Sequence, residues 1–269
     1  MRRCCALCLL ARQKLFESKR CTVQAIRCLA LCLLALALAA PSLLSARSKA
    51  EQNATTIDSG TFSILVGGRK VGTETFAIKQ LPTSSVATSE IKIEDGGSKA
   101  RQTSELRLSP KGELQHYEWH ELAPGKNEIV VEPQEDFLVE RITSETEKKF
   151  EQPFLMPLTT MVLDDFFFSD WEILTWRYLA SICKTVNGAT QCVPQKSQFG
   201  VIVPRQHASM VVSIEFIGRD HMPIHGTETE LSHYRISSEE ASDWDLWFDG
   251  NQKLVRILIP ATKMEVLRD

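Results

Sequence analysis

The sequence lacks the motifs that usually identify an enzyme. It contains no G-x-S-x-G nucleophile elbow, no H-E-x-x-H metal motif and no glycine-rich phosphate loop. The pairs Gly67-Gly68 and Gly96-Gly97 lie between alternating runs, where a hairpin turn requires positive φ, so they do not indicate phosphate binding. No internal repeat is evident. We therefore expect a non-catalytic protein that needs neither a cofactor nor a metal.

Cysteine is almost absent after the N-terminal region. Six of the eight cysteines lie before residue 33, and only Cys183 and Cys192 follow. These two flank Asn187-Gly188 symmetrically, and Asn-Gly between two extended runs is a strong hairpin signal. In such a hairpin Cys183 faces Cys192, with the Cα atoms about 4.5–5.5 Å apart, which a disulfide accepts. The pattern predicts a disulfide, provided the domain is exported.

Export is indicated by the N-terminal region. Residues 28–40 form an apolar run that follows Arg27 and precedes small residues, so residues 1–46 are predicted to be a signal peptide. Cleavage is expected near Ala46 or Ala50, which makes the mature protein periplasmic or secreted. The stretch before Arg27 is long for a signal peptide, and a start near Val23 would explain it. The alternative is an uncleaved N-terminal membrane anchor over residues 28–46.

Positive charge is scarce once the leader is removed. Loss of residues 1–46 leaves 24 Lys+Arg against 33 Asp+Glu, a formal net charge of −9. A chain this acidic, without a basic cluster, is a poor candidate for nucleic-acid binding. It also offers no polybasic segment for anionic lipid.

The remaining chain has the pattern of a β protein. Short extended runs alternate with turn signals throughout residues 58–269, which predict a single β-rich domain after a flexible segment over 47–57. Phe62 and Ile64 alternate with polar positions, and Phe76 and Ile78 repeat the alternation after a Gly-Gly turn. Hairpin-length loops favour antiparallel neighbours in a meander.

Residues 154–180 interrupt the strand pattern. Ser169 and Glu172 match a capping box, and Phe168 with Ile173 matches a hydrophobic staple, so a helix is predicted over residues 170–180. This helix is apolar over most of its circumference and should be buried.

The preceding residues 154–168 are apolar but contain prolines, which suits a second short helix or a lid. The expected fold is mainly β: a single large curved antiparallel sheet, a half-barrel-like meander, with one or two short helices packed on the concave face.

Three segments carry a resemblance to known proteins. "GTFSILVGGRKVGTETF", "LDDFFF…RYLA" and "WFDGNQKLVRILIP…EVLRD" resemble uncharacterised exported bacterial proteins known only as domains of unknown function. The order of strands and helix is also similar to the half-barrel of periplasmic lipoprotein carriers. The first resemblance covers most of residues 58–269 and implies no known activity. The second is at the level of the fold, which does not transfer function by itself.

Two pairs of histidines have a spacing that could suit metal ligands. On a strand, His116, Glu118 and His120 point to one side and could begin a Zn²⁺ site. An ordinary solvent face is favoured, because such side chains seldom converge without a further ligand. His221 and His225 flank Pro223, which excludes a shared helical face, so a solvated loop is expected.

An aspartate pair and a glycosylation sequon do not indicate a functional site. Asp164 and Asp165 are adjacent and should diverge, so they are expected in an N-terminal helical turn or on the solvent side. Asn53 begins a glycosylation sequon, which means little in a bacterial host.

Two functions remain open. One is an envelope protein that binds a hydrophobic or amphiphilic ligand, such as a lipid or a lipoprotein acyl chain, in a half-barrel cavity. The other is a non-catalytic structural or assembly protein with a filled core and an envelope protein as partner. In the first case the cavity is expected to be lined by Phe62, Ile64, Phe76 and Ile78 from the sheet and by Met161, Trp171 and Trp176 from the plug.

Overall fold

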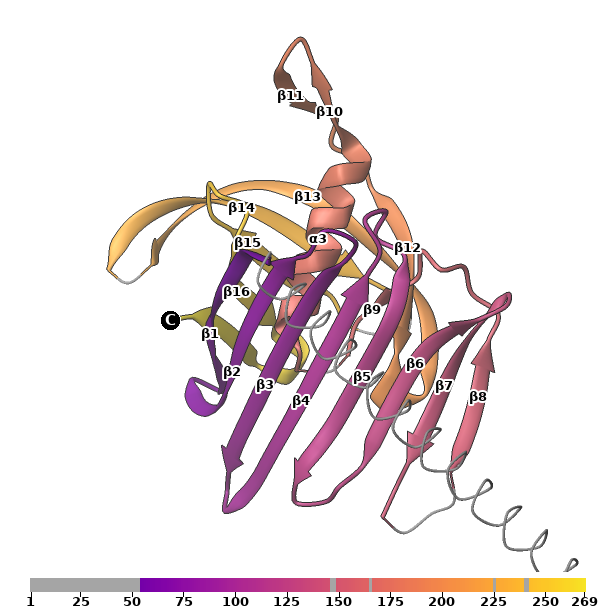
Figure 1. The fold of residues 1–269 in the computed structure, drawn as a ribbon. Coiled ribbons are helices and arrows are strands. Elements are labelled where there is room, and N and C mark those ends of the chain that lie inside the picture. Colours follow the sequence, from indigo (N-terminus) through magenta and orange to yellow (C-terminus); the bar gives the residue numbers. More distant parts are fainter. Residues whose placement is uncertain (1–53, 146–148, 165, 225, 240–241) are drawn as a thin grey trace, which may run out of the picture. The chain divides into compact units, whose positions relative to one another are not determined.

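The computed structural model describes residues 54–269 except 146–148, 165, 225 and 240–241. Residues 54–269 form one compact unit. Within the described residues, one 15-stranded sheet, one α-helix and a separate two-stranded sheet make up the fold (Figure 1). The predicted signal peptide lies outside the described residues. Thr55, Thr56 and Ile57, which we expected in a flexible segment, belong to the first strand.

The first half of the large sheet, called here the N-terminal half, consists of eight strands in chain order. They are β1 (Thr55–Val66), β2 (Arg69–Gln80), β3 (Ser85–Asp95), β4 (Ser98–Leu108), β5 (Leu114–Ala123), β6 (Glu128–Gln134), β7 (Phe137–Thr143) and β8 (Phe150–Phe154).

The C-terminal half of the sheet follows the helix, except for its short edge strand. Its strands are β9 (Met161–Val162), β12 (Ser197–Val203), β13 (Ala208–Ile224), β14 (Thr227–Ser237), β15 (Trp244–Phe248), β16 (Leu254–Ile259) and β17 (Met264–Arg268). The remaining elements are α3 (Phe168–Ile182), the separate hairpin β10 (Cys183–Val186) and β11 (Ala189–Cys192), and the 3₁₀ turns η1 (Pro204–Gln206) and η2 (Pro260–Thr262).

The two halves join because the first strand pairs with the last. β1 lies between β2 and β17, with Phe62 opposite Arg268 and Ile64 opposite Val266. From this junction each half continues as a meander, to β8 at one edge and β9 at the other. The prediction of one large, mainly antiparallel sheet is confirmed. One pair of strands is parallel: β9, at the edge of the C-terminal half, lies parallel to β12. The sheet is therefore mixed.

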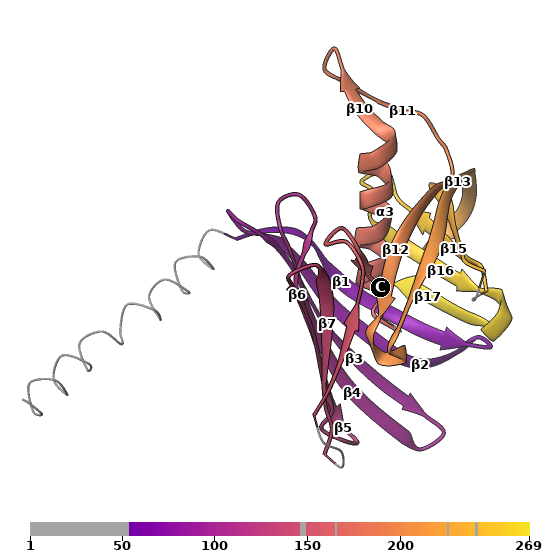
Figure 2. The same cartoon turned by 90° about the vertical axis from the view of Figure 1, so that its right-hand side faces the viewer.

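Strand alternation decides which face of the sheet is covered. In β2, Glu74, Phe76 and Ile78 are buried while the intervening residues are more exposed. Phe62 and Ile64 on β1 share this face with them, which we call the inner face. Figure 2 shows α3 between the strands of the two halves. The main hydrophobic core comprises side chains from both halves of the sheet and from α3.

The helix starts earlier than the sequence predicts, and the predicted capping box is wrong. Ser169 lies inside α3, and no side chain caps the helix from its N-cap residue, Phe167. The carboxylate of Glu74 on β2 instead accepts hydrogen bonds from the backbone N–H groups of Phe168 (2.8 Å) and Ser169 (3.3 Å). A residue 94 positions away therefore supplies the cap, which local sequence patterns cannot reveal.

Residues 155–164 do not form a second helix, and residues 160–164 are buried rather than part of an exposed lid. Met161 and Val162 are buried and pair with β12, and Leu163 is also buried. The N–H of Leu163 donates to the carbonyl of Ile202, which continues this contact. Residues 160–164 therefore belong to the buried interior, whereas Leu155 (79% exposed) and Leu158 (38% exposed) lie at the surface.

The sheet is not closed into a barrel, but side chains connect regions near its two edges. Gln152 on β8 donates from Nε2 to the carbonyl of His207, which follows η1, over 3.3 Å. The Nδ1 atom of His207 lies 3.0 Å from Oε2 of Glu140 on β7. The N–H of Leu114 donates to the carbonyl of Leu158. These contacts bring the two edges of the open sheet together.

Candidate functional site

Helix α3 is held from both halves of the sheet by hydrogen bonds. Glu74 of the N-terminal half binds its first turn. Oε1 of Glu172 accepts from the backbone N–H of Leu254 on β16 over 3.1 Å. Nε1 of Trp176 donates to the carbonyl of Gln252 over 2.6 Å. The helix is therefore fixed in place, and a hollow lies on each side of it.

The first hollow, the β2–β4 cavity, lies between α3 and the N-terminal half. Its volume is about 230 Å³. Most of its lining is apolar. It is lined by Ile57, Ile78, Gln80, Ser85, Ala87, Leu106, Leu108, Ile173 and Trp176.

The second hollow, the Trp171 cavity, lies between α3 and the C-terminal half and has a volume of about 300 Å³. The indole of Trp171 stacks on that of Trp244, with ring centroids 3.6 Å apart and planes inclined by 19°. Its lining has an apolar set and a polar set. The apolar residues are Leu163, Trp171, Val201, Val203, Ala208, Met210, Val212, Ile236 and Trp244, and the polar ones are Gln206, Ser237, Ser238 and Ser242.

The seven residues expected to line one cavity are distributed over three environments. Ile78 and Trp176 line the β2–β4 cavity, and Trp171 lines the other. Phe62, Ile64, Phe76 and Met161 line neither hollow and are packed in the core. Phe62 and Phe76 stack with ring centroids 4.9 Å apart. The helix separates the two hollows.

Several residues at these hollows were missed by reasoning from sequence. Trp244 lies 73 positions after Trp171, and only the pairing of β15 within the C-terminal half brings the two rings together. Val201 and Val203 belong to the apolar run Val201–Val203 of β12, all of which is buried, and such a run indicates burial but not a cavity. Alternation indicates which side chains face inward. It does not indicate where facing side chains leave a space.

Asp164 corrects the expectation of a solvent-side carboxylate. It is fully buried, accepts a 2.5 Å hydrogen bond from the hydroxyl of Tyr117, and pairs with Arg205, whose Nε lies 2.8 Å from Oδ1. Arg205 also donates from Nη1 to Gln102 over 2.8 Å. This group connects β4 and β5 to η1, so it links the N-terminal half of the sheet to the C-terminal half. Asp165, the neighbour in the sequence, lies outside the described residues.

Burial also raises the pKa of acidic groups next to α3. Desolvation is the largest influence on Glu74 and raises its pKa to about 7, while hydrogen bonds from Ser89, Phe168 and Ser169 act in the opposite direction. Burial, with further contributions from Glu74 and Asp164, raises the pKa of Asp170 well above its usual value. The N-terminal end of α3 therefore lies next to two carboxyl groups whose pKa values are raised.

The predicted histidine motif on β5 forms a chain of side-chain hydrogen bonds. Glu118 Oε2 lies 3.1 Å from Nε2 of His116, and its other oxygen binds His120. Hydrogen bonds from His120 lower the pKa of Glu118. Nδ1 of His116 also lies 3.0 Å from Glu132 on β6. Among the described residues, no group of three His, Cys, Asp or Glu side chains is arranged to hold a metal ion.

The second histidine motif does not form the predicted loop. His221 lies on β13, which continues through Pro223 to Ile224 and pairs with β14. Nε2 of His221 lies 3.6 Å from Glu230 across this pair. The proline is tolerated because the long hairpin here is largely exposed, and His225 lies outside the described residues.

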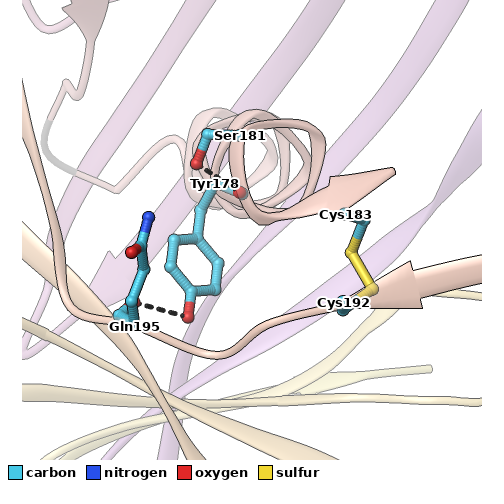
Figure 3. Close-up of a disulfide and its surroundings, with 5 residues drawn as sticks. All are labelled: Tyr178, Ser181, Cys183, Cys192 and Gln195. Carbon is cyan, nitrogen blue, oxygen red and sulfur yellow. Dashed lines mark hydrogen bonds between the residues drawn. A yellow bond between two sulfur atoms is a disulfide. The ribbon is translucent and has the colours of Figure 1, made fainter. Parts of the chain in front are cut away.

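The hairpin after α3 forms as predicted. Cys183 is opposite Cys192, with Cα atoms 3.9 Å apart and a disulfide between them (Figure 3). Asn187 and Gly188 adopt positive φ of 52° and 79°, as a type I′ turn requires. Near its base, the hydroxyl of Tyr178 donates to the carbonyl of Gln195 over 2.9 Å. All residues of β11 are exposed, and within the hairpin it is Cys183 of β10 that packs against the core.

These features define a class of protein: an open, barrel-like β sheet whose interior is occupied by one helix flanked by two hollows. No family model matches the chain, and no curated protein matches it. A solved structure with a similar fold is a β-barrel-like protein of domain of unknown function DUF1849 from Brucella abortus, with 6% sequence identity and a TM-score of 0.49. The match covers 78% of this chain and 94% of the other. Within the described residues, no helix has the length and apolar character of a membrane span.

Proposed function

We propose that this protein binds a small hydrophobic or amphiphilic ligand in the Trp171 cavity. The observation that carries the proposal is the composition of the lining, which combines apolar walls with Gln206 and three serines. Apolar pockets with a few polar groups are typical of small-molecule sites. Among the described residues, the side chains that line this cavity are apolar or neutral, which fits a hydrophobic or amphiphilic ligand.

The volume of the cavity limits the size of the ligand and the affinity that it can reach. A volume of about 300 Å³ corresponds to roughly ten non-hydrogen atoms, if each takes about the 30 Å³ of a water molecule. Burial of about eight methylene groups at about 0.8 kcal/mol each gives roughly 6 kcal/mol before the cost of association. Because association itself costs several kcal/mol, we expect weak affinity, in about the millimolar range, for a segment of a lipid or lipoprotein acyl chain rather than the whole chain.

We also propose that the protein acts outside the cytoplasm, in the periplasm or after secretion. The disulfide in an exposed hairpin supports this, because such bonds persist in oxidising compartments. The apolar N-terminal run and the small residues after it support cleavage near Ala46 or Ala50.

Filling each cavity in turn tests the proposal. Ala208 lines the Trp171 cavity and Ala87 lines the β2–β4 cavity, so Ala208→Phe and Ala87→Phe are a matched pair. Binding of 1-octanol and octanoate to the mature chain would be measured by calorimetry. Ala208→Phe should weaken binding at least tenfold, while Ala87→Phe should leave it within about twofold. Binding that neither variant weakens, or that the wild type lacks, would contradict the proposal.

A structural or assembly role in the cell envelope is the second candidate. The complete burial of Phe62, Ile64 and Met161 favours it, because these residues make a filled core between the two hollows. In that case neither probe should bind, and the protein should instead be recovered with an envelope protein after cross-linking in its host.

A further inference from the structure

The β10–β11 hairpin is a part of the fold that the proposed ligand cavity does not use. Figures 1 and 2 show it extending from the C-terminal end of α3, beyond the strands of the large sheet. Every residue of the hairpin is exposed except Cys183, which is partly buried. Within the described residues its two strands form a sheet of their own, so each strand has a free edge. Most of the hairpin surface is therefore available to a partner.

One face of this hairpin, called here the hairpin face, combines apolar and cationic groups. Strand alternation places on it the opposed pairs Lys184–Gln191 and Val186–Ala189. A hollow of about 280 Å³, the hairpin hollow, lies against this face. It is lined by Ser181, Ile182, Lys184, Val186, Gln191, Val193 and Gln195. Val186 is 43% exposed and Val193 is 72% exposed, so apolar surface borders the hollow from two positions.

The charge of this region differs from that of the whole chain. Residues 173–214 contain no Asp or Glu, although the chain has 34 acidic residues in 269. Lys184 is the only charged side chain that lines the hairpin hollow, and it makes no ion pair with any described residue. The next cation along the chain, Lys196, lies 3.6 Å from Glu215. An acidic segment is repelled by a protein of net negative charge but attracted to a free lysine in a region without acids.

We propose that the hairpin face binds a short extended segment of a partner protein, in which a carboxylate lies next to an apolar side chain. The apolar side chain enters the hairpin hollow against Val186 and Val193, and the carboxylate pairs with Lys184. The backbone of the segment adds to a free edge of the hairpin, which is a common mode of peptide recognition.

The hairpin hollow has room for such a side chain. Its volume corresponds to roughly nine non-hydrogen atoms at about 30 Å³ each, which accommodates a Leu or Phe side chain. It shares no lining residue with the Trp171 cavity, so the docking surface does not depend on the proposed function.

Two other occupants fit the hairpin face less well. Anionic membranes attract clusters of about four to eight Lys or Arg, and this face carries one. A two-fold dimer brings the same patch of both copies together. Because the hairpin face contains no acid, Lys184 would find no carboxylate in such a dimer. A separate acidic segment is therefore the occupant that matches the charge.

Selection from a displayed library of random peptides tests the proposal. The library carries segments of roughly seven residues, slightly longer than a typical strand, and the mature chain with its disulfide intact is the target. Enriched peptides should contain Asp or Glu next to an apolar residue. Calorimetry with synthetic copies of the enriched peptides would then give dissociation constants for the wild type and the variants.

The variants separate the charge from the apolar surface. Lys184→Glu should weaken binding by about tenfold or more, because attraction becomes repulsion. The same peptide with Lys in place of its acid should bind Lys184→Glu more tightly than it binds the wild type. Val193→Ser should weaken binding about fivefold by removing apolar contact.

Two controls match these variants. Lys79→Glu makes the same change of net charge at an exposed position of β2, and Thr190→Ser alters the opposite face of the hairpin. Both should leave the dissociation constants within about twofold. All four changed side chains are exposed, so circular dichroism should show the same fold in every variant.

Several results would overturn the proposal. They are a selection that enriches no peptide, enriched peptides without an acid, and equal effects of Lys79→Glu and Lys184→Glu. Sedimentation of the wild type, but not of Lys184→Glu, with phosphatidylglycerol vesicles would assign the hairpin face to a membrane instead. A dimer in analytical ultracentrifugation that Val193→Ser dissociates would assign it to a second copy of the chain. None of these results bears on octanoate binding in the Trp171 cavity.

Discussion

At the scale of single residues, buried carboxyl groups distinguish this protein from an ordinary β sheet. Glu172 is fully buried on α3, and its Oε1 accepts from the backbone of Leu254. Desolvation, followed by repulsion from Asp58, raises its pKa to about 9. Glu172 therefore holds a proton at neutral pH. A carboxyl group that stays protonated in a core makes stability depend on pH.

The first prediction concerns this dependence. The pKa of Glu172 is higher in the folded protein than the usual value of 4.5, so the folded state binds the extra proton. Stability should then fall as pH rises between about 4.5 and 9. Glu172→Gln keeps an acceptor for Leu254 and removes the titration. Relative to the wild type it should gain about 2–4 kcal/mol of unfolding free energy between pH 5 and pH 8.

Urea unfolding at several pH values measures this difference. Glu105→Gln is the control, because Glu105 is a partly exposed strand residue paired with Arg107, and it should leave the pH dependence unchanged. A Glu172→Gln curve parallel to that of the wild type would show that Glu172 does not titrate in this range.

At the scale of elements, the β10–β11 hairpin is stabilised differently from the large sheet. None of its side chains is fully buried, so hydrophobic burial contributes little to it. An isolated two-stranded hairpin is marginally stable in water. The disulfide between Cys183 and Cys192 therefore maintains the hairpin, while the core maintains α3.

The second prediction follows because the disulfide stabilises the hairpin and the core stabilises α3. Changing both Cys183 and Cys192 to Ala should cost only about 1–3 kcal/mol, because the closed loop is short, and the fold should survive. Thermal unfolding with circular dichroism measures the loss, and reduction of the wild type should reproduce it. Protein from the periplasm should contain no free thiol before reduction and two afterwards. Loss of the whole fold in the double variant would show that the hairpin supports the core.

At the scale of the whole molecule, the position of the first strand bears on where the predicted leader can be cleaved. The first strand starts at Thr55 and is central in the sheet, between β2 and β17. A cleavage site near Ala46 or Ala50 would leave this strand intact. A site beyond residue 55 would remove part of the strand that joins the two halves of the sheet.

The third prediction is that the mature chain begins between residues 47 and 51. N-terminal sequencing of protein purified from its host tests this directly. Recovery of a membrane-bound form that retains residues 28–46 would instead establish the anchor.

The sequence by itself determined the features that depend on neighbouring residues. Alternation in β1 and β2 gave the inner face, and Asn187-Gly188 gave the hairpin, its register and its disulfide, because turn geometry and strand period act over a few residues. Only the tertiary structure decided the pairing of β1 with β17, the cap that Glu74 provides for α3, and the stack of Trp171 on Trp244. These contacts join residues from 73 to about 200 positions apart, and they form because burial brings distant strands and the helix together. The cavities lie where those distant surfaces meet without filling the space, so no local pattern could show them.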